Sequence, residues 1–276
     1  MDQLVMDQLG YLDYVSNEAH MQTYLEYQAR YASTIRESDK VLVEFVRERT
    51  PRSPGGSRPR LLDIGCSSGN LLAHLRTEQP ELELVGGDIT ARAVAGCRAD
   101  PRLAGVEFAQ LDMLDLDWQL DMVDLEGQLD VLARGGARRR FDVVVANAAL
   151  MFFDEREFDQ AMQSLAGTLE RGGWLVAFDY FHPFEQEVTV VETSAAFPEG
   201  LKYRFRGFAR VRESLRRAGF GEPEFRPFRI PIDLDEPQDT RDVSSYTRRG
   251  PGGDGMSFRG TVFQPWCHMA ARKETA

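Results

Sequence analysis

The sequence LLDIGCSSGN at residues 61–70 decides the fold, and it is compatible with two kinds of site. An apolar run is followed by small residues and then by leucines at helical spacing, which predicts a strand, a tight turn and a helix. The turn fits the G-x-S-x-G pattern of a hydrolase nucleophile elbow and also a degenerate glycine-rich nucleotide loop. Ser67 is therefore either a nucleophile or a small residue beside a cofactor.

The composition is that of a globular chain able to bury a full core. Its 276 residues are 42% hydrophobic and 28% charged, and 33 Lys and Arg against 44 Asp and Glu give a net charge of −11. This charge argues against nucleic acid or an anionic membrane as the main partner. Three widely spaced cysteines form no disulfide framework or C-x-x-C metal motif, and the acidic N-terminal stretch lacks the features of a signal peptide. We therefore expect a cytoplasmic protein.

Strand and helix patterns alternate along the chain. The predicted strands are 61–64, 82–88, 106–110, 141–146, 174–178, 224–232 and 261–271, and the predicted helices are 20–48, 71–75, 91–98, 154–172 and 211–218. This alternation predicts a doubly wound α/β sheet, with the doubly apolar run 141–146 at its centre. Asp154 and Glu157 form a capping-box pattern at a helix start. The acidic stretch 114–140 is longer than an ordinary crossover and is predicted to be an inserted or extended helix.

The hydrolase interpretation of Ser67 needs an acid and then a histidine later in the chain. The sequence supplies them in that order as Asp179 with His182 or His268. However, no oxyanion loop of the HGGG type precedes residue 61. This interpretation also leaves Asp88 and Asp112 unexplained, although each closes a strand at the sheet edge where ligands of open α/β folds bind.

The nucleotide interpretation explains more residues with one geometry. Small residues at 65, 67 and 69 let the backbone approach a ligand, and the following helix N-terminus attracts an anionic group. Asp88 lies 23 residues after Gly65 (88 − 65), the spacing at which an acidic residue reaches the hydroxyls of a ribose. Asn70 stands where a dinucleotide-binding motif would have its last glycine, which disfavours NAD.

Five segments in order resemble the class I S-adenosylmethionine-dependent methyltransferases. They are LLDIGCSSGNLL, VGGDIT, FAQLDMLD, FDVVVANAALMFF and LERGGWLVAFDY, which together span about residues 61–180, followed by RAGFGEPEF and a closing QPWCHMAARK strand. The resemblance implies a Rossmann-like fold: a mostly parallel seven-stranded sheet with an antiparallel last strand. It further implies an N-terminal helical lid at 1–50 and a cofactor-binding domain at 51–276, with insertions at about 114–140, 181–207 and 235–260.

The resemblance implies S-adenosylmethionine as the cofactor and no metal. Asp63 and Gly65 are expected near its amino-acid end, Asp88 at the ribose, and Asp112 at the adenine amino group. Ser67 replaces the commoner middle glycine of the loop. The full set of expected cofactor-binding residues is Asp63, Gly65, Cys66, Ser67, Gly69, Asp88, Ile89, Asp112, Met113, Asn147, Tyr27 and Arg30.

Several of these assignments have a structural alternative. The stripe of Tyr24, Tyr27 and Tyr31 is either ordinary core or a lid whose aromatic faces favour the sulfonium cation. Arg30 either meets the cofactor carboxylate or lies on a solvated helix face. Asp112 is either an adenine ligand or a turn residue.

The transferred methyl group is already activated by the sulfonium, so the protein mainly aligns the reactants and excludes water. His182, just past the fifth strand, is the first candidate for a general base and Tyr180 the second; a loop hydrogen bond is the alternative role for His182. His268 is expected to be structural. The acceptor is expected to be a small molecule, methylated on O or N, in primary or specialised metabolism. A set of aromatic residues suits a small, partly apolar acceptor: Phe181, Phe184, Tyr203, Phe205 and Tyr246. Four arginines either hold an acceptor carboxylate or lie on solvated surface: Arg204, Arg206, Arg248 and Arg249.

Two other functions remain open from the sequence: a serine hydrolase using Ser67, and a cofactor-binding protein without turnover. Either a monomer or a homodimer is compatible with the chain.

Overall fold

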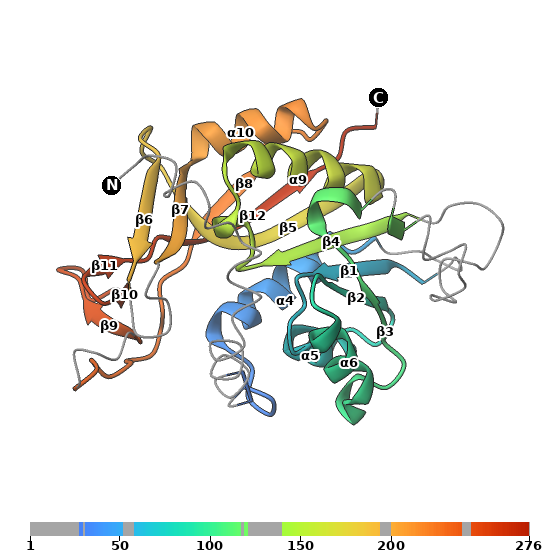
Figure 1. The fold of residues 1–276 in the computed structure, drawn as a ribbon, viewed down its shortest axis with the longest axis horizontal. Coiled ribbons are helices and arrows are strands. Elements are labelled where there is room, and N and C mark those ends of the chain that lie inside the picture. Colours follow the sequence, from blue (N-terminus) through green and yellow to red (C-terminus); the bar gives the residue numbers. More distant parts are fainter. Residues whose placement is uncertain are drawn as a thin grey trace.

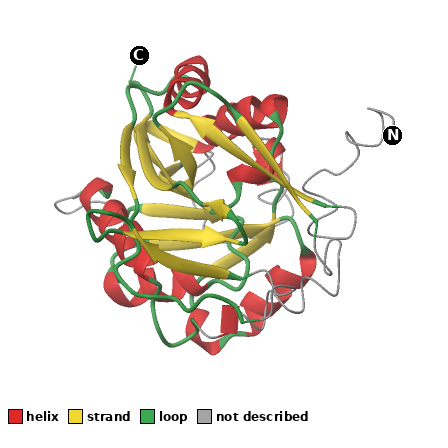
Figure 2. Ribbon diagram, turned by 90° about the vertical axis from the view of Figure 1, so that its left-hand side faces the viewer, coloured by secondary structure: helices red, strands yellow, loops and turns green. Residues whose placement is uncertain are grey.

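The computed structural model describes residues 28–29, 31–51, 58–116, 119–120, 140–193, 200–238 and 244–275. Strands and helices alternate in a layered α/β fold (Figures 1 and 2). The strands are β1 (Arg60–Ile64), β2 (Glu83–Asp88), β3 (Glu107–Gln110), β4 (Phe141–Asn147), β5 (Leu169–His182), β6 (Val188–Glu192), β7 (Leu201–Gly207), β8 (Glu224–Pro227), β9 (Ser245–Arg249), β10 (Gly255–Arg259), β11 (Val262–Phe263) and β12 (Trp266–Arg272).

The main sheet has the strand order β3-β2-β1-β4-β5-β12-β8. β1 is parallel to β2 and β4, whereas β12 is antiparallel to β5 and β8. This path confirms the predicted mostly parallel sheet with an antiparallel last strand. The strand order reverses between β1 and β4, so the carboxyl ends of these two strands flank the crevice where ligands of such folds bind.

Helices cover both faces of the sheet. They are α4 (Glu37–Arg49), α5 (Asn70–Glu78), α6 (Ala91–Ala99), α9 (Glu155–Thr168) and α10 (Phe208–Arg217), with 3-10 turns η1 (Pro101–Leu103), η2 (Met113–Asp115) and η3 (Leu150–Phe152). α4, α5 and α6 lie on one face, and α9 and α10 on the other (Figure 1). Each layer buries its own apolar cluster, with Phe45 and Leu72 in one and Phe158 and Leu165 in the other. Burying each such side chain contributes roughly 1.5–3 kcal/mol.

Element ends differ from the prediction where backbone geometry overrides the apolar pattern. The capping box predicted at Asp154 and Glu157 is present, but α9 ends at Thr168 and not at Gly172. Leu169 already pairs with Phe141, and a register shift follows in which Gly172 adopts a φ of 78°. The prediction was wrong there because the helical spacing of Leu169 also suits a strand start.

Two further differences concern the ends of the chain. The helix predicted at 20–48 has a turn at residues 31–34, and α4 begins at Glu37. The strand predicted at 261–271 is divided into β11 and β12, because Pro265 has no N–H for a ladder hydrogen bond. The insertion predicted at 114–140 lies largely outside the described residues.

Two smaller strand units adjoin the carboxyl end of β5. The antiparallel β6–β7 pair is joined to β5 by parallel pairing of Phe181 with Arg206 and His182 with Gly207. β9, β10 and β11 form a separate antiparallel sheet on the same side of the molecule (Figure 1). The β6–β7 pair lies within the predicted insertion 181–207, and β9 and β10 lie within 235–260, whereas β11 lies just beyond it. Among the described helices, none combines the length and apolar character needed to cross a membrane.

Candidate cofactor site

The loop after β1 is shaped by residues with left-handed backbone. Gly65 and Gly69 have φ values of 76° and 69°, and Ser67 has a φ of 51°, a conformation uncommon for residues other than glycine. The N–H groups of Gly65 and Cys66 donate to the Gly87 carbonyl at 2.7 and 3.0 Å. A Cβ at Gly69 would lie 2.6 Å from the Leu103 Cδ1, so that position also needs glycine for space. The loop is thus fixed against β2.

Asp88 closes β2 and lies across this loop. Its Oδ2 accepts a hydrogen bond from the Ser67 N–H at 2.9 Å, and its Oδ1 accepts from the N–H and hydroxyl of Thr90 at 2.9 and 2.8 Å. Thr90 also caps α6. A carboxylate has about four lone-pair positions, so Asp88 retains capacity for a ligand hydroxyl.

A second carboxylate, Asp63, is buried on β1 beneath the loop. Burial, followed by the negative charges of Asp39 and Asp88, raises the pKa of Asp63 to about 8. Its Oδ1 and the Ser67 Oγ are buried and have no hydrogen-bond partner among the described residues. Buried polar groups normally have partners, so these two atoms indicate a ligand. Three carboxylates in close proximity favour a ligand with a positive charge.

Asp39 was not predicted from the sequence. It lies in the first turn of α4, is 3% exposed, and accepts a hydrogen bond of 3.2 Å from the Asn147 Nδ2. Burial raises its pKa. Asn147 ends β4, so this contact joins α4 to the carboxyl edge of the sheet. An acidic residue in a first helical turn is ordinary in a sequence, and its burial depends on how α4 packs.

The segment before α4 is tied to the start of α5. The Asn70 Nδ2 donates to the Gln28 carbonyl at 2.9 Å, and Arg102 donates to the Ala32 carbonyl and to the Asn70 Oδ1 at 2.6 and 3.1 Å. The chain near residue 28 therefore lies beside the glycine loop. The predicted cofactor residues Tyr27 and Arg30 fall outside the described residues.

The residues predicted at the adenine end lie at the ends of β2 and β3. The Asp112 Oδ1 accepts from the Leu114 N–H at 2.9 Å and so caps η2. Met113 is buried beside it. The Gln110 side chain donates to the Ile89 carbonyl at 2.9 Å, which links the two strand ends.

The hydrogen bonds that a serine hydrolase would need are not formed by the described residues. Asp179 accepts from the N–H groups of Leu150, Met151 and Tyr180 at 2.7, 3.2 and 2.7 Å. The Nε2 atoms of the two histidines lie instead near main-chain carbonyls: His182 at 3.3 Å from Phe205, and His268 at 3.0 Å from Ser38. Asp179 therefore fixes the turn after β4 and orients no histidine.

The two predicted catalytic residues lie on the extension of β5 beyond the sheet. Tyr180 is 3% exposed, and its hydroxyl accepts a hydrogen bond from Gln264. Burial raises the pKa of Tyr180 well above its ordinary value, so the hydroxyl keeps its proton at neutral pH. His182 lies four residues past Phe178, which pairs with Asn147 at the sheet edge, or roughly 13 Å along an extended strand. Its buried Nδ1 has no partner among the described residues.

The four arginines predicted for an acceptor carboxylate are engaged within the protein. Arg204 donates to the Phe152 carbonyl at 3.2 Å. Arg248 pairs with Glu236 at 2.7 Å, and Arg249 with Asp233 at 2.8 Å. Arg206 is 1% exposed and bonds main-chain carbonyls, so it is not available to an acceptor.

Residues 62–175, which include the glycine loop, Asp63 and Asp88, match the family model of a methyltransferase domain. This chain carries a methyltransferase domain. Its fold is that of class I methyltransferases, a class that uses S-adenosylmethionine as the cofactor. The search of the curated proteins found no match.

Solved structures support the methyltransferase fold. One is an S-adenosylmethionine-dependent methyltransferase from Methanosarcina mazei, with 14% identity and a TM-score of 0.55 over 84% of this chain and 98% of that one. Another is the sugar N-methyltransferase KedS8 from Streptoalloteichus sp. ATCC 53650, with 19% identity and a TM-score of 0.52 over 91% and 92% of the two chains. At these identities the likeness concerns the fold.

The buried groups of the methyltransferase site fit its cofactor. S-adenosylmethionine carries an ammonium, a sulfonium and a carboxylate on one side of a ribose. The unpartnered oxygen of Asp63 suits a cation, and the N-terminus of α5 suits an anion. Asp88 stands at the strand end where ribose hydroxyls are bound in nucleotide-binding α/β folds.

Proposed function

We propose that this enzyme transfers the methyl group of S-adenosylmethionine to an oxygen or nitrogen of a small-molecule metabolite. The observation that carries the proposal is the bond between the Ser67 N–H and Asp88, with the unpartnered Asp63 oxygen nearby. Together they combine a polar strand end for a ribose with a buried carboxyl group for the cofactor ammonium. A ligand that joins an amino acid to a ribose requires both of these groups in one site.

Residues at the carboxyl edge of β1, β2 and β3 would hold the cofactor. Asp63 and Asn147, with Asp39 behind them, hold the amino-acid end, and the carboxylate meets the N–H groups at the start of α5. Asp88 takes the ribose hydroxyls. The other contacts come from the loop residues Gly65, Cys66, Ser67 and Gly69, from Ile89, Asp112 and Met113 at the adenine, and from Tyr27 and Arg30 above.

The acceptor lies beyond β5, between the β6–β7 pair and the β9–β11 sheet. An aromatic cluster marks this side: Tyr180 packs on Trp266 and Phe205 with ring centroids 4.2 and 4.7 Å apart. Tyr180 and Phe205 are themselves buried, and aromatic side chains at the edge of this cluster suit contact with a partly apolar small molecule. The structural likeness to a sugar N-methyltransferase supports a small-molecule acceptor, such as a specialised metabolite.

Methyl transfer needs the acceptor atom, the methyl carbon and the sulfur in line, in a site without water. When bound, S-adenosylmethionine supplies the activated methyl group. His182 is the base of this proposal: its Nε2 donates to the Phe205 carbonyl, which leaves a lone pair on Nδ1 to take a proton from an acceptor hydroxyl or ammonium. Tyr180 keeps its proton and orients the acceptor.

In this arrangement, residues 1–50 form a lid over the cofactor and residues 51–276 form the catalytic domain, with the ranges 114–140, 181–207 and 235–260 inserted in it. We place the enzyme in the cytoplasm. The acceptor selectivity then resides in the last two ranges.

Transfer of a tritium-labelled methyl group to a fractionated metabolite extract tests the proposal. We expect label in a small-molecule fraction with wild-type protein, less label with Asp88→Ala at subsaturating cofactor, and a reduced rate with His182→Gln. Arg216→Ala, on the exposed face of α10, is the control for general loss of fold. Binding of S-adenosylhomocysteine without label transfer to any fraction would instead favour the cofactor-binding protein without turnover.

A further inference from the structure

Arg206 is the largest fully buried side chain of the described residues, yet it is charged. It lies on β7, and its guanidinium donates to the carbonyls of Leu150 and Phe153 at 3.0 and 2.5 Å. A third, longer bond of 3.5 Å reaches the Asp154 carbonyl. The Arg206 donors therefore bind the carbonyl end of η3 and the start of α9, a part of the chain about 50 residues earlier.

The opposite end of the same turn is held by Asp179. Its Oδ2 accepts from the N–H groups of Leu150 and Met151 at 2.7 and 3.2 Å. The 3-10 turn η3 is thus bound at its N–H end by a buried carboxylate and at its carbonyl end by a buried guanidinium. Because hydrogen bonds to charged groups are stronger than neutral ones, these two side chains fix the turn.

The position of η3 determines one wall of the cofactor site. The chain runs from Asn147 through Ala148, whose φ of 56° is a strained value for alanine, into this turn. Ala149 packs against the glycine loop, since a Cβ on Gly65 would lie 3.4 Å from the Ala149 Cβ. A displaced η3 would therefore move both Asn147 and the surface facing the amino-acid end of the cofactor.

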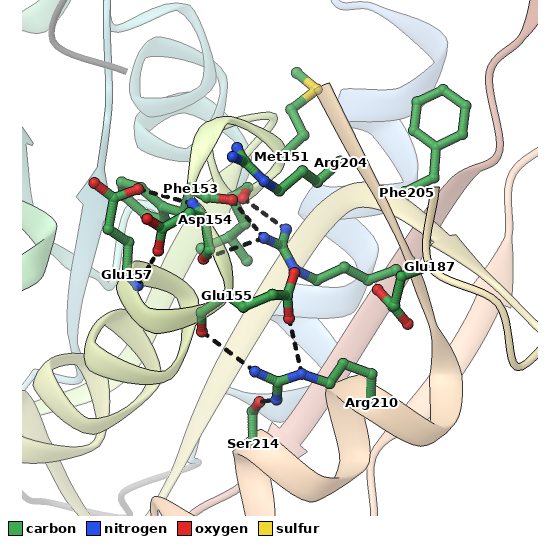
Figure 3. Close-up of polar contacts among 12 residues, drawn as sticks. Met151, Phe153, Asp154, Glu155, Glu157, Glu187, Arg204, Phe205, Arg210 and Ser214 are labelled. Carbon is green, nitrogen blue, oxygen red and sulfur yellow. Dashed lines mark hydrogen bonds and ion pairs between the residues drawn. The ribbon is translucent and has the colours of Figure 1, made fainter. Parts of the chain in front are cut away.

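The surroundings of Arg206 indicate that carbonyl binding, and not ion pairing, is its main task. The nearest carboxylate is Glu155, 48% exposed, at 3.5 Å from Nε, and the Phe158 ring lies 4.2 Å from the guanidinium. Figure 3 shows Glu155 joined to Arg210, with a bond of 2.8 Å between the two side chains. An apolar side chain would fill the Arg206 space at a lower desolvation cost, but it would leave the buried η3 carbonyls unpaired.

We propose that Arg206 is a positioning residue for methyl transfer. It joins β7, on the acceptor side of the enzyme, to the turn that lines the methionine end of the cofactor. It acts through Asn147 and Ala149 and does not itself touch the reactants. This inference rests on the proposed function.

The test compares Arg206→Met with Arg210→Met. Arg210 is a matched control because it also bonds α9, through Glu155 and Asp159, whereas its described bonds do not reach the η3 carbonyls. We expect Arg206→Met to bind S-adenosylhomocysteine at least tenfold more weakly in calorimetry. We expect the affinity of Arg210→Met for S-adenosylhomocysteine to stay within twofold of wild type. This should hold even if its thermal unfolding midpoint falls as far as that of Arg206→Met. Arg206→Lys, which keeps a charge and one donor, should have intermediate affinity.

Hydrogen exchange of the ligand-free proteins separates this inference from the proposed function. Arg206→Met should exchange faster in the peptide covering residues 148–154 while β1 keeps its protection. Affinity and exchange both at wild-type level in folded Arg206→Met would overturn the inference. If Arg206→Met does not fold, Arg206→Lys and the wild type provide the test. The ligand should slow hydrogen exchange at residues 148–154 in the wild type. An unchanged rate at these residues would also overturn the inference. A wild-type protein that does not bind the ligand would contradict the proposed function, and exchange would still report on Arg206.

Discussion

The Asp88 Oδ2 accepts a hydrogen bond of 2.9 Å from the Ser67 N–H. This bond joins the loop after β1 to the end of β2 and explains how Ser67 keeps a left-handed φ of 51° without being glycine. The bond also favours the cofactor-loop interpretation of the G-x-S-x-G pattern over the hydrolase interpretation. The Ser67 N–H is bonded to the residue that is proposed to bind the ribose, and the Ser67 hydroxyl is buried without a hydrogen-bond partner among the described residues.

Replacement of Asp88 by alanine should weaken S-adenosylhomocysteine binding by about 1–3 kcal/mol, the cost of leaving polar partners unmatched. Calorimetry measures this directly. Thr90→Val is the control, because it removes one bond to the Asp88 Oδ1 but keeps the carboxylate. Equal loss in the two variants would show that Asp88 acts only by holding the loop.

The affinity for S-adenosylhomocysteine should rise between pH 6 and pH 8 because of Asp63. Its pKa of about 8 means that the carboxyl is mostly protonated at pH 7, and a bound ammonium would favour the ionised form. Binding then releases a proton, so affinity increases by up to about tenfold per pH unit below the pKa. Adenosine, which lacks the ammonium, should show no such rise, nor should Asp63→Asn. A rise that persists in Asp63→Asn would assign the effect to another group.

An active-site phosphonate probe should not label Ser67. The Ser67 Oγ has no hydrogen-bond partner among the described residues, so no described base takes up its proton. Mass spectrometry of the treated protein measures this, and a known serine hydrolase is the positive control. Ser67→Ala should retain S-adenosylhomocysteine binding within about tenfold, the value of one hydrogen bond. Stoichiometric labelling of Ser67 would restore the hydrolase interpretation.

Stability should fall between pH 6.5 and pH 4 partly because of His268. Burial lowers its pKa from 6.5 to about 4, so the neutral ring contributes stability above pH 6.5 that is lost as the pH falls toward 4. The difference corresponds to about 3 kcal/mol. Urea unfolding of wild type and His268→Gln at pH 7 and pH 4 isolates this share, because the other groups titrate in both proteins. Identical pH dependence in the two proteins would show that His268 takes up its proton at the same pH in the folded protein as in the unfolded chain.

The sequence predicted those features that depend on local pattern. The doubly apolar 141–146 run became the central strand β4, and Asp154 with Glu157 formed the capping box. The sequence did not single out Asp39, and it placed Arg206 at the acceptor site and not at η3. The reason is that a sequence pattern does not show which charged residues become buried. Both are buried only after distant segments pack: Asp39 against Asn147, and Arg206 against η3. Such contacts join residues 52 to 108 positions apart, beyond the reach of any periodic pattern.

A crystal structure with S-adenosylhomocysteine is the most direct test of the proposed roles of Asp88 at the ribose and Asp63 at the ammonium. We expect the ribose hydroxyls within hydrogen-bond distance of the Asp88 carboxylate, and the ligand ammonium beside the Asp63 Oδ1, which then has a partner. A ligand bound elsewhere, or a site that stays empty at saturating ligand with protein side chains against Asp63, would contradict it.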